Sequence, residues 1–371
     1  MPVFGTRPEA VKLAPVIREL RSRPDEFETV VVVTAQHRSM LDQVLKVFEI
    51  EPAHDLNLMQ HGQTLAQVTS RALEGVQALI EQCQPEVVLV QGDTTTVFAG
   101  ALAAFYCQVA VGHVEAGLRT SNKYNPFPEE MNRRLTTALT DLHFAPTPQA
   151  RDNLFREGVP AERVYLTGNT VIDALLTAKD RIKPVAQPTG RMLLVTAHRR
   201  ENLGEPMREI CLGVSDLVHQ FSDVHVVFAM HLNPKVREAV RDVLGGHERV
   251  DLIEPPDYDE FVALMARAHL ILTDSGGVQE EAPALGKPVL VLRTTTERPE
   301  GVTAGTAKLV GPDRAAIVQS AAELLGDPAA YESMSQAANP YGDGRASHRI
   351  AEVLLHHFRG KPRPADWGGH A

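Results

Sequence analysis

Short runs of apolar residues alternate along the chain with longer stretches in which apolar side chains recur every three or four positions. The clearest apolar runs are residues 29–35, 86–92, 108–114, 191–197, 224–230, 270–276 and 288–293. Continuous Val, Ile and Leu runs of this kind are typical of strands buried on both faces of a parallel sheet. The spacing in segments such as 66–82 predicts helices. The alternation therefore predicts repeated β-α-β units and a doubly wound α/β fold.

The alternation is interrupted once, where a predicted helix is followed by a segment rich in Pro and Gly before the strand at 191–197. A chain of 371 residues exceeds one ordinary hydrophobic core, so two domains are expected. We predict two Rossmann-like domains facing a cleft, an N-terminal one over 1–170 and a C-terminal one over 171–345. A helix over 346–358 is expected to complete the first domain, with a disordered tail over 359–371.

Composition and charge narrow the classes of function. The net charge of −10 argues against a general nucleic-acid binder, because neutralising phosphates requires a basic surface. The sequence has no membrane-length apolar run and no N-terminal signal segment, so we expect no membrane association and a cytoplasmic location. Cys83, Cys107 and Cys211 have neither metal-ligand nor disulfide spacing, which favours a reducing compartment and no metal. The apolar segment at residues 1–4 is short for a central strand. This favours a true N-terminus of the protein a few residues upstream.

Polar clusters follow six of the predicted strands. They occupy residues 5–9, 36–38, 92–96, 198–202, 231–233 and 273–277. In open α/β sheets, ligands bind beyond the carboxyl ends of the strands. The clusters therefore predict one ligand site to which both domains contribute.

The run Ser275-Gly276-Gly277 stands at a predicted strand-to-helix turn. Backbone N–H groups at such a turn suit a phosphate or pyrophosphate. One turn later, Glu280 or Glu281 would hold the two adjacent hydroxyls of a ribose. The alternative is a Gly-rich turn followed by acids that the helix dipole favours.

Several basic side chains could bind the same anion. Arg7 and Lys12 lie around a predicted helix start, where they would neutralise phosphate charge or carry only solvated helix charge. His198 precedes two arginines, which favours an anion contact over a buried histidine, and His231 is consistent with either role. No G-x-G-x-x-G motif follows the first strand and no P-loop occurs. A nucleotide is therefore expected as substrate, with neither NAD nor ATP as cofactor.

The acidic residues have competing interpretations. Asp93 is a suitable helix N-cap. Glu129 and Glu130 precede two arginines by four residues, which is how an ordinary helix begins. Glu115 has no such local explanation, because it directly follows a buried strand. A functional role is favoured for Glu115.

Together these segments resemble the non-hydrolysing UDP-N-acetylglucosamine 2-epimerases. The resemblance rests on FGTRPEAVKLAP, TAQHRSMLDQVL, QGDTTTVFAGALAAFY, VGHVEAGLRT, PFPEEMNRRLT, TGNTVIDAL, TAHRRENLG and TDSGGVQEEAPALGKPVLVLRTTTERPEG. In this order and spacing the motifs are specific and cover nearly the whole chain. The resemblance implies a glycosyltransferase-B-like fold of two Rossmann-like domains.

The resemblance also implies an activity. Such an enzyme interconverts UDP-N-acetylglucosamine (UDP-GlcNAc) and UDP-N-acetylmannosamine (UDP-ManNAc) by eliminating UDP to 2-acetamidoglucal and adding it back, without NAD. A homodimer in cell-envelope polysaccharide biosynthesis would be expected. Asp93, Glu115, Glu129 and His198 match the catalytic residues, while Glu130 matches none. The matching substrate contacts are Arg7, Lys12, Arg133, Ser275, Gly276, Gly277, Glu281 and Arg298.

Some bacterial members bind a second UDP-GlcNAc as an activator. The matching positions here hold Gln36, Glu129, Arg199 and His231. However, Ser39 and Gly62 stand where such members have Gln and Arg. The rival interpretations are a hydrolysing relative that releases free ManNAc and UDP, a glycosyltransferase of the same fold, and an inactive UDP-sugar sensor.

Overall fold

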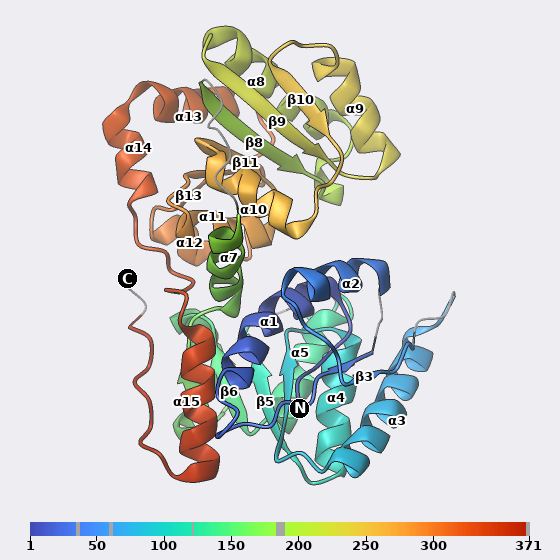
Figure 1. The fold of residues 1–371 in the computed structure, drawn as a ribbon. Coiled ribbons are helices and arrows are strands. Elements are labelled where there is room, and N and C mark those ends of the chain that lie inside the picture. The colour runs from blue at the N-terminus through green and yellow to red at the C-terminus, as the bar shows by residue number, and fades with distance from the viewer. Residues whose placement is uncertain (35–37, 59–61, 121, 183–189, 369–371) are drawn as a thin grey trace. The chain divides into compact units, whose positions relative to one another are not determined.

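The computed structural model describes residues 1–34, 38–58, 62–120, 122–182 and 190–368 (Figure 1). The chain divides into two compact units. The first comprises Met1–Thr177 and the C-terminal segment from Tyr341, and the second comprises Ala178–Pro340. The boundary falls after Thr177, inside the helix Thr170–Arg181. The sequence led us to expect it between residues 170 and 171. In the described part of the chain, every helix is too short or too polar to span a membrane.

The first unit is built on parallel strands covered by helices. Its strands are β1 Val3–Phe4, β2 Val32–Val33, β3 His54–Asp55, β4 Val87–Gln91, β5 Ala110–Val114, β6 Leu142–Ala145 and β7 Val164–Leu166. Its helices are α1 Arg7–Arg21, α2 Arg38–Val47, α3 Leu65–Cys83, α4 Thr95–Tyr106, α5 Glu129–Leu139, α6 Pro148–Arg156, η1 Ala161–Arg163, α7 Thr170–Arg181 and α15 Ala346–Arg359. One sheet has the order β1-β2-β3 and the other β4-β5-β6-β7. A parallel bridge between Pro2 and Leu89 joins β1 to β4.

The second unit repeats this plan. Its strands are β8 Arg191–Ala197, β9 Val224–Met230, β10 Val250–Ile253, β11 Leu270–Thr273, β12 Val289–Val291 and β13 Ala307–Leu309. Its helices are η2 Arg200–Asn202, α8 Glu205–Gln220, α9 Pro234–Leu244, α10 Tyr258–Arg267, α11 Gly276–Ala284, α12 Pro299–Thr303, α13 Arg314–Gly326 and α14 Pro328–Ser335. The parallel sheet has the order β10-β9-β8-β11-β12-β13.

The predicted α/β fold is confirmed. Each of the seven apolar runs contains a strand, because strands of a covered parallel sheet bury both faces. In β8, for example, Leu193 and Val195 are fully buried and belong to the same core cluster as Met207 and Ile210 of α8. Of the strands outside those runs, β1 has only two residues, and β3, β6, β7, β10 and β13 have two to four residues and carry polar or charged side chains. Both features weaken the sequence signal.

Strand order determines where a ligand can bind in each unit. In the first unit β1 lies between β2 and β4, and in the second β8 lies between β9 and β11. In each unit the second and third strands therefore lie on one side of the first strand, and the fourth strand lies on its other side. At such a switch point the loops beyond the carboxyl ends diverge and leave room for a ligand. The informative loops are those after β1 and β4, and those after β8 and β11.

The C-terminal segment is ordered beyond its helix. Helix α15 packs against α1, with Arg23 Nη1 2.5 Å from Glu352 of α15 (Figure 1). The sequence led us to expect a disordered tail over 359–371, whereas Arg359 ends α15 and part of the described segment 360–368 packs against the first unit. Trp367 is 4% exposed, and its backbone N–H donates to the Leu166 carbonyl at 2.8 Å. The tail thus covers the outer edge of β7 and buries an aromatic ring, which a polar sequence did not suggest.

Replacing Trp367 with Ala should destabilise the first unit by about 3 kcal/mol, because a buried indole is lost and a cavity remains. The ring lies in a small core cluster with Ala145, Leu154 and Leu166. Urea denaturation followed by circular dichroism measures the change in free energy of unfolding.

Trp367→Phe is the matched control and should recover most of that loss. The chain has one Trp, so native emission reports on this site alone and should be blue-shifted and protected from acrylamide. Emission typical of exposed indole, or an Ala variant as stable as the parent, would contradict the packing of the tail.

Candidate functional site

Arg7 lies at the switch point of the first unit. It is the first residue of α1 and is half-buried. Its side chain has no hydrogen bond or ion pair with another residue in the described part of the chain. The positive end of the helix dipole and the first backbone N–H groups attract anions at the N-terminus of a helix. The guanidinium is therefore free to contact an anionic ligand.

Glu115 follows β5 and is held in place by two other segments. Its Oε2 forms an ion pair with Lys12 of α1 and accepts a hydrogen bond from Asn169 Nδ2 at 3.1 Å. Its side chain is 8% exposed. The backbone φ is +66°, a strained conformation for a residue with a Cβ that is often found at functional sites. Lys12 thus contacts a predicted catalytic carboxylate, and Asn169 is a residue that the sequence gave no reason to select.

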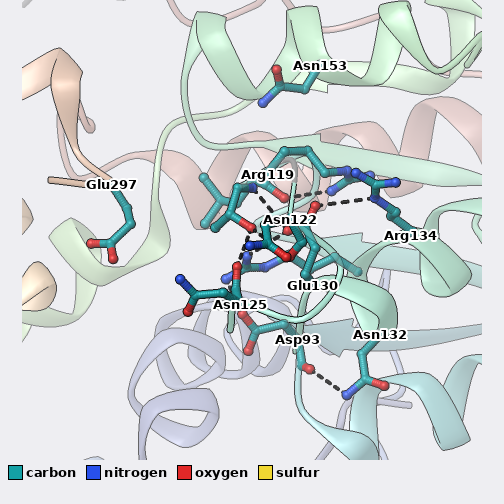
Figure 2. A network of polar contacts seen from close by, with 12 residues as sticks. Asp93, Arg119, Asn122, Asn125, Glu130, Asn132, Arg134, Asn153 and Glu297 are labelled. Carbon is teal, nitrogen blue, oxygen red and sulfur yellow. Dashed lines mark hydrogen bonds and ion pairs between the residues drawn. The ribbon is translucent and has the colours of Figure 1, made fainter. Parts of the chain in front are cut away.

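Asp93 lies at the end of β4 and pairs with α5. Its Oδ2 is 2.5 Å from Arg133 Nη2, and its carbonyl accepts from Asn132 Nδ2 at 2.9 Å (Figure 2). The alternative role of Asp93 as a helix cap is wrong. The N-cap of α4 is Thr94, whose hydroxyl accepts from the Val97 N–H at 3.4 Å. The Asp93 side chain is therefore directed to Arg133 instead of the helix backbone.

The two acids that begin α5 differ completely. Glu129 is partly exposed, and its side chain has no hydrogen bond or ion pair with another residue that the structure describes. Glu130 is fully buried, accepts from the Thr120 N–H at 3.1 Å and lies 3.3 Å from Arg133 and from Arg134 (Figure 2). Glu130 therefore holds the loop and helix together, while Glu129 remains available to a ligand.

His113 connects the two strand ends that carry Asp93 and Glu115. It is fully buried in β5, and its Nε2 donates to the carbonyl of Gly92 at 2.7 Å. Burial lowers the pKa of His113 to about 4, so the ring is neutral at pH 7. Gly92 has a φ of +81°, which a residue with a side chain rarely adopts. The histidine thus fixes an unusual turn directly before Asp93.

Glu9 is a further buried acid that sequence reasoning did not select. It is 1% exposed, and its Oε2 accepts from the N–H groups of Gly5 at 3.1 Å and Thr6 at 2.7 Å. Its Oε1 accepts from the Thr94 hydroxyl at 2.7 Å. Burial raises the pKa of Glu9 to about 7, although these hydrogen bonds act in the opposite direction. The sequence signal was a capping box, Thr6 with Glu9, which indicates a helix start and nothing more.

In the second unit, Asp274 organises the loop that contains His198. This fully buried carboxylate accepts from the N–H groups of His198 and Arg199, both at 2.8 Å, and from Asn202 Nδ2 at 2.9 Å. Its Oδ1 lies 3.0 Å from His198 Nδ1. Burial alone would raise the pKa of Asp274, but His198 and the two N–H groups outweigh it and hold the pKa below its usual range. Asp274 stands in the polar cluster at 273–277, which was its only sequence signal.

His198 also has an aromatic neighbour. The imidazoles of His198 and His231 stack with their centroids 5.6 Å apart. Partial burial and the neighbouring His198 lower the pKa of His231. Beside this ring, the Asp274 carboxylate contacts His198 through Nδ1. The carboxylate favours a proton on Nδ1 of His198 and so leaves Nε2 for a ligand.

The Ser275-Gly276-Gly277 turn begins α11, as the sequence predicted. Ser275 is the N-cap residue, and its side chain does not cap the helix, so the first N–H groups of α11 lack an intrahelical partner. A Cβ built on Gly276 would lie 3.8 Å from the guanidinium of Arg298 and 3.9 Å from that of Arg199. Two cations thus flank a helix N-terminus, an arrangement suited to a diphosphate.

Glu280 and Glu281 have different surroundings. Glu280 is 2% exposed and forms an ion pair with Arg298. Glu281 accepts from the Tyr258 hydroxyl at 3.0 Å through Oε1, and its Oε2 lies 3.9 Å from a Cβ built on Gly277. Glu281 is therefore the acid next to the glycine turn, and Tyr258 is a partner that the sequence did not reveal.

Two expectations concern absent or undescribed groups. Gln36 lies outside the described residues, as do the side chains of 38–40. Within the described ranges, no group of three or more His, Cys, Asp and Glu side chains is arranged to hold a metal ion.

Two Rossmann-like units, each with polar residues gathered at its switch point, define a two-domain α/β protein of the glycosyltransferase-B type. The family model described as UDP-N-acetylglucosamine 2-epimerase matches residues 18–355. The chain therefore belongs to the UDP-N-acetylglucosamine 2-epimerase family, as the sequence motifs indicated.

Individual relatives are similar over nearly their full length. The UDP-N-acetylglucosamine 2-epimerase of Bacillus subtilis (strain 168) is 59% identical over 362 residues, covering 96% of this chain and 95% of that protein. The structure of the Neisseria meningitidis UDP-GlcNAc 2-epimerase bound to UDP-GlcNAc has a TM-score of 0.87 at 49% identity, covering 95% of this chain and 98% of that one. The S. aureus MnaA–UDP structure has a TM-score of 0.88 at 50% identity, covering 99% of each chain.

The buried Glu9 carboxyl predicts a specific pH dependence of stability. Because its pKa is raised from 4.5 to about 7, folding takes up a proton between these values. The stability that Glu9 contributes is complete below about pH 4.5 and is lost as the pH rises towards 7. The free energy of unfolding of the parent, relative to Glu9→Gln, should therefore fall between pH 5 and 7.5. Urea denaturation of both proteins at several pH values tests this, and a constant or rising difference would contradict the burial of Glu9.

Proposed function

We propose that the protein interconverts UDP-GlcNAc and UDP-ManNAc by epimerisation at C2. Family membership supports the reaction, and relatives of similar fold are described as bound to UDP-GlcNAc or to UDP. The residues of the second unit provide the cations and N–H groups that a nucleoside diphosphate requires.

The observation that carries the proposal is the gathering of three acids in one corner of the first unit. Asp93 and Glu115 follow the adjacent strands β4 and β5, and Arg133 links Asp93 to the helix that begins with Glu129. Inversion at C2 requires a proton to leave one face and another to arrive at the opposite face. Two faces require more than one acid/base group, and this corner supplies three carboxylates in three different environments.

The proposed chemistry avoids an oxidation. The C2 hydrogen of UDP-GlcNAc has no adjacent carbonyl to acidify it, so simple deprotonation is not feasible. A carboxylate instead takes the C2 proton while the bond from C1 to the phosphate oxygen breaks and its electron pair leaves with UDP. The product is 2-acetamidoglucal with a C1–C2 double bond. UDP then adds back at C1 as a proton is delivered to the other face of C2, so no NAD is required.

The second unit stabilises the leaving diphosphate in this scheme. Negative charge develops on UDP as the C1–O bond breaks, and fixed cations and N–H groups lower the free energy of that transition state. Arg199, Arg298 and the first N–H groups of α11 would contact the phosphates. His198 would contact them through the ring nitrogen that Asp274 leaves free. Glu281 would hold the ribose hydroxyls while Tyr258 fixes its orientation.

The reaction can be tested directly with UDP-GlcNAc in D2O. The expected product is UDP-ManNAc that carries deuterium at C2, formed without added NAD and detected by NMR spectroscopy and mass spectrometry. Free ManNAc with UDP as the only products would instead identify the hydrolysing reaction. No turnover under any condition would favour a UDP-sugar sensor and overturn the proposal.

Glu115→Gln and Glu129→Gln should each lower turnover by roughly 100-fold or more, because each removes an acid/base group. UDP binding, measured by isothermal titration calorimetry, should persist in both variants.

Glu74→Gln is the matched control, since Glu74 is an exposed acid on α3, and it should leave turnover unchanged. Glu130→Gln should instead destabilise the fold, because Glu130 is buried with three donors around it. A Glu129→Gln variant with a near-normal rate would remove Glu129 from the proposed mechanism.

A further inference from the structure

Glu9 reaches beyond its own helix. A glutamate at the third position of a capping box normally satisfies one N–H of its own helix start and remains at the surface. Here Oε2 accepts two N–H groups, and Oε1 accepts the hydroxyl of Thr94, 85 residues away in sequence. Helix capping therefore accounts for only half of what this side chain does.

The two ends of the Glu9 carboxylate hold two different loops. The N–H groups belong to Gly5 and Thr6, the residues directly before Arg7. The hydroxyl belongs to Thr94, the residue directly after Asp93. The carboxylate thus lies across the switch point between β1 and β4, where these loops diverge. The candidate anion contact and a candidate acid/base residue are each one residue from a group that Glu9 binds.

We propose that Glu9, acting through Thr94, is a positioning residue that fixes Arg7 and Asp93 relative to each other for the reaction. The proposal rests on the proposed epimerase function. Elimination requires the C2 proton and the leaving phosphate to be aligned at the same moment. The fold meets this requirement with a short hydrogen bond, 2.7 Å long, between the two loops.

The second unit contains a corresponding contact. Asp274 follows β11 and accepts the N–H groups of two successive residues after β8. In both units a buried carboxylate therefore joins the loops on either side of the switch point and accepts two successive N–H groups. Helix capping does not explain Asp274 either, since the N-cap residue of α11 is Ser275.

Thr94→Val removes the hydroxyl that Glu9 contacts and keeps the shape of the side chain. We expect turnover of UDP-GlcNAc to fall roughly 10- to 100-fold, as a small displacement of a catalytic group would cause, with little change in KM. Thr94→Ser restores the hydroxyl and should recover most of the lost rate. Steady-state kinetics on the full-length protein measures both.

Thr64→Val is the matched control for loss of a helix cap. Thr64 caps α3 through the Gln67 N–H at 3.3 Å, much as Thr94 caps α4 at 3.4 Å, and it is exposed and does not contact Glu9. Its loss should leave kcat unchanged. If Thr94→Val and Thr64→Val had the same kcat, the hydroxyl would act only as a cap and the positioning role would be wrong.

Glu9→Gln and the double variant with Thr94→Val complete the test. The amide of Glu9→Gln can still accept hydrogen bonds from the two N–H groups and can still face Thr94. The kcat of Glu9→Gln should therefore exceed that of Thr94→Val. Adding Thr94→Val to Glu9→Gln should lower kcat by a smaller factor than in the parent, because the two residues act through one contact. Independent factors that simply multiply would overturn the coupling.

The crystal structure of Thr94→Val tests positioning without any activity. The turn at 92–94 should be displaced relative to residues 5–7, and an unmoved turn would refute the proposal. Absence of turnover in the parent protein would refute the proposed function alone. The two failures are therefore distinguishable.

Discussion

The candidate site depends on two buried carboxylates that hold diverging loops together. Glu9 accepts two successive N–H groups after β1, and Asp274 accepts two after β8. Burying a carboxyl group is costly unless hydrogen bonds offset its desolvation, and here each acid accepts three donors from the loops. The cost of burial and the order of the loops are thus coupled: neither loop can move away without leaving an acid unsatisfied. Each contact spans the switch point that the strand order creates, where a parallel sheet has no backbone ladder to join its loops.

The same principle extends outward from these contacts. In the first unit, neutral His113 holds the turn at Gly92, and Lys12 holds Glu115 in a strained backbone conformation. In the second unit, Arg298 is held by buried Glu280 next to the glycine turn of α11. Groups proposed to contact a ligand are therefore held in place by neighbouring side chains of the fold. Such support keeps a site preorganised, so that little reorganisation is required when charge develops on a leaving group.

The fold could be predicted from the sequence, and residues of a candidate site could be proposed from it, because both have local signals. Buried parallel strands appear as apolar runs, and ligand groups appear as polar clusters at their ends. The supporting residues have no such signal. Glu9 looks like a capping-box acid, Asn169 directly precedes a helix, and Asp274 is one member of a turn. Their supporting roles are not visible in the local sequence because their partners are 54 to 85 residues distant. The ordered tail was missed for a similar reason: Trp367 packs against β7, two hundred residues earlier in the chain.

Glu129 and Glu130 show how a structural acid differs from one proposed to be catalytic. A carboxylate offers about four acceptor positions. Glu130, Glu9 and Asp274 are buried, and each accepts from three donors of the fold. Glu129 has no partner among the described residues, and only one oxygen of Asp93 has a side-chain donor there. At the level of sequence, Glu129 and Glu130 are equivalent first-turn acids of the same helix. One residue of helical rotation directs the two side chains differently: Glu130 is buried against Thr120 and the arginines, and Glu129 is partly exposed, as its proposed role requires.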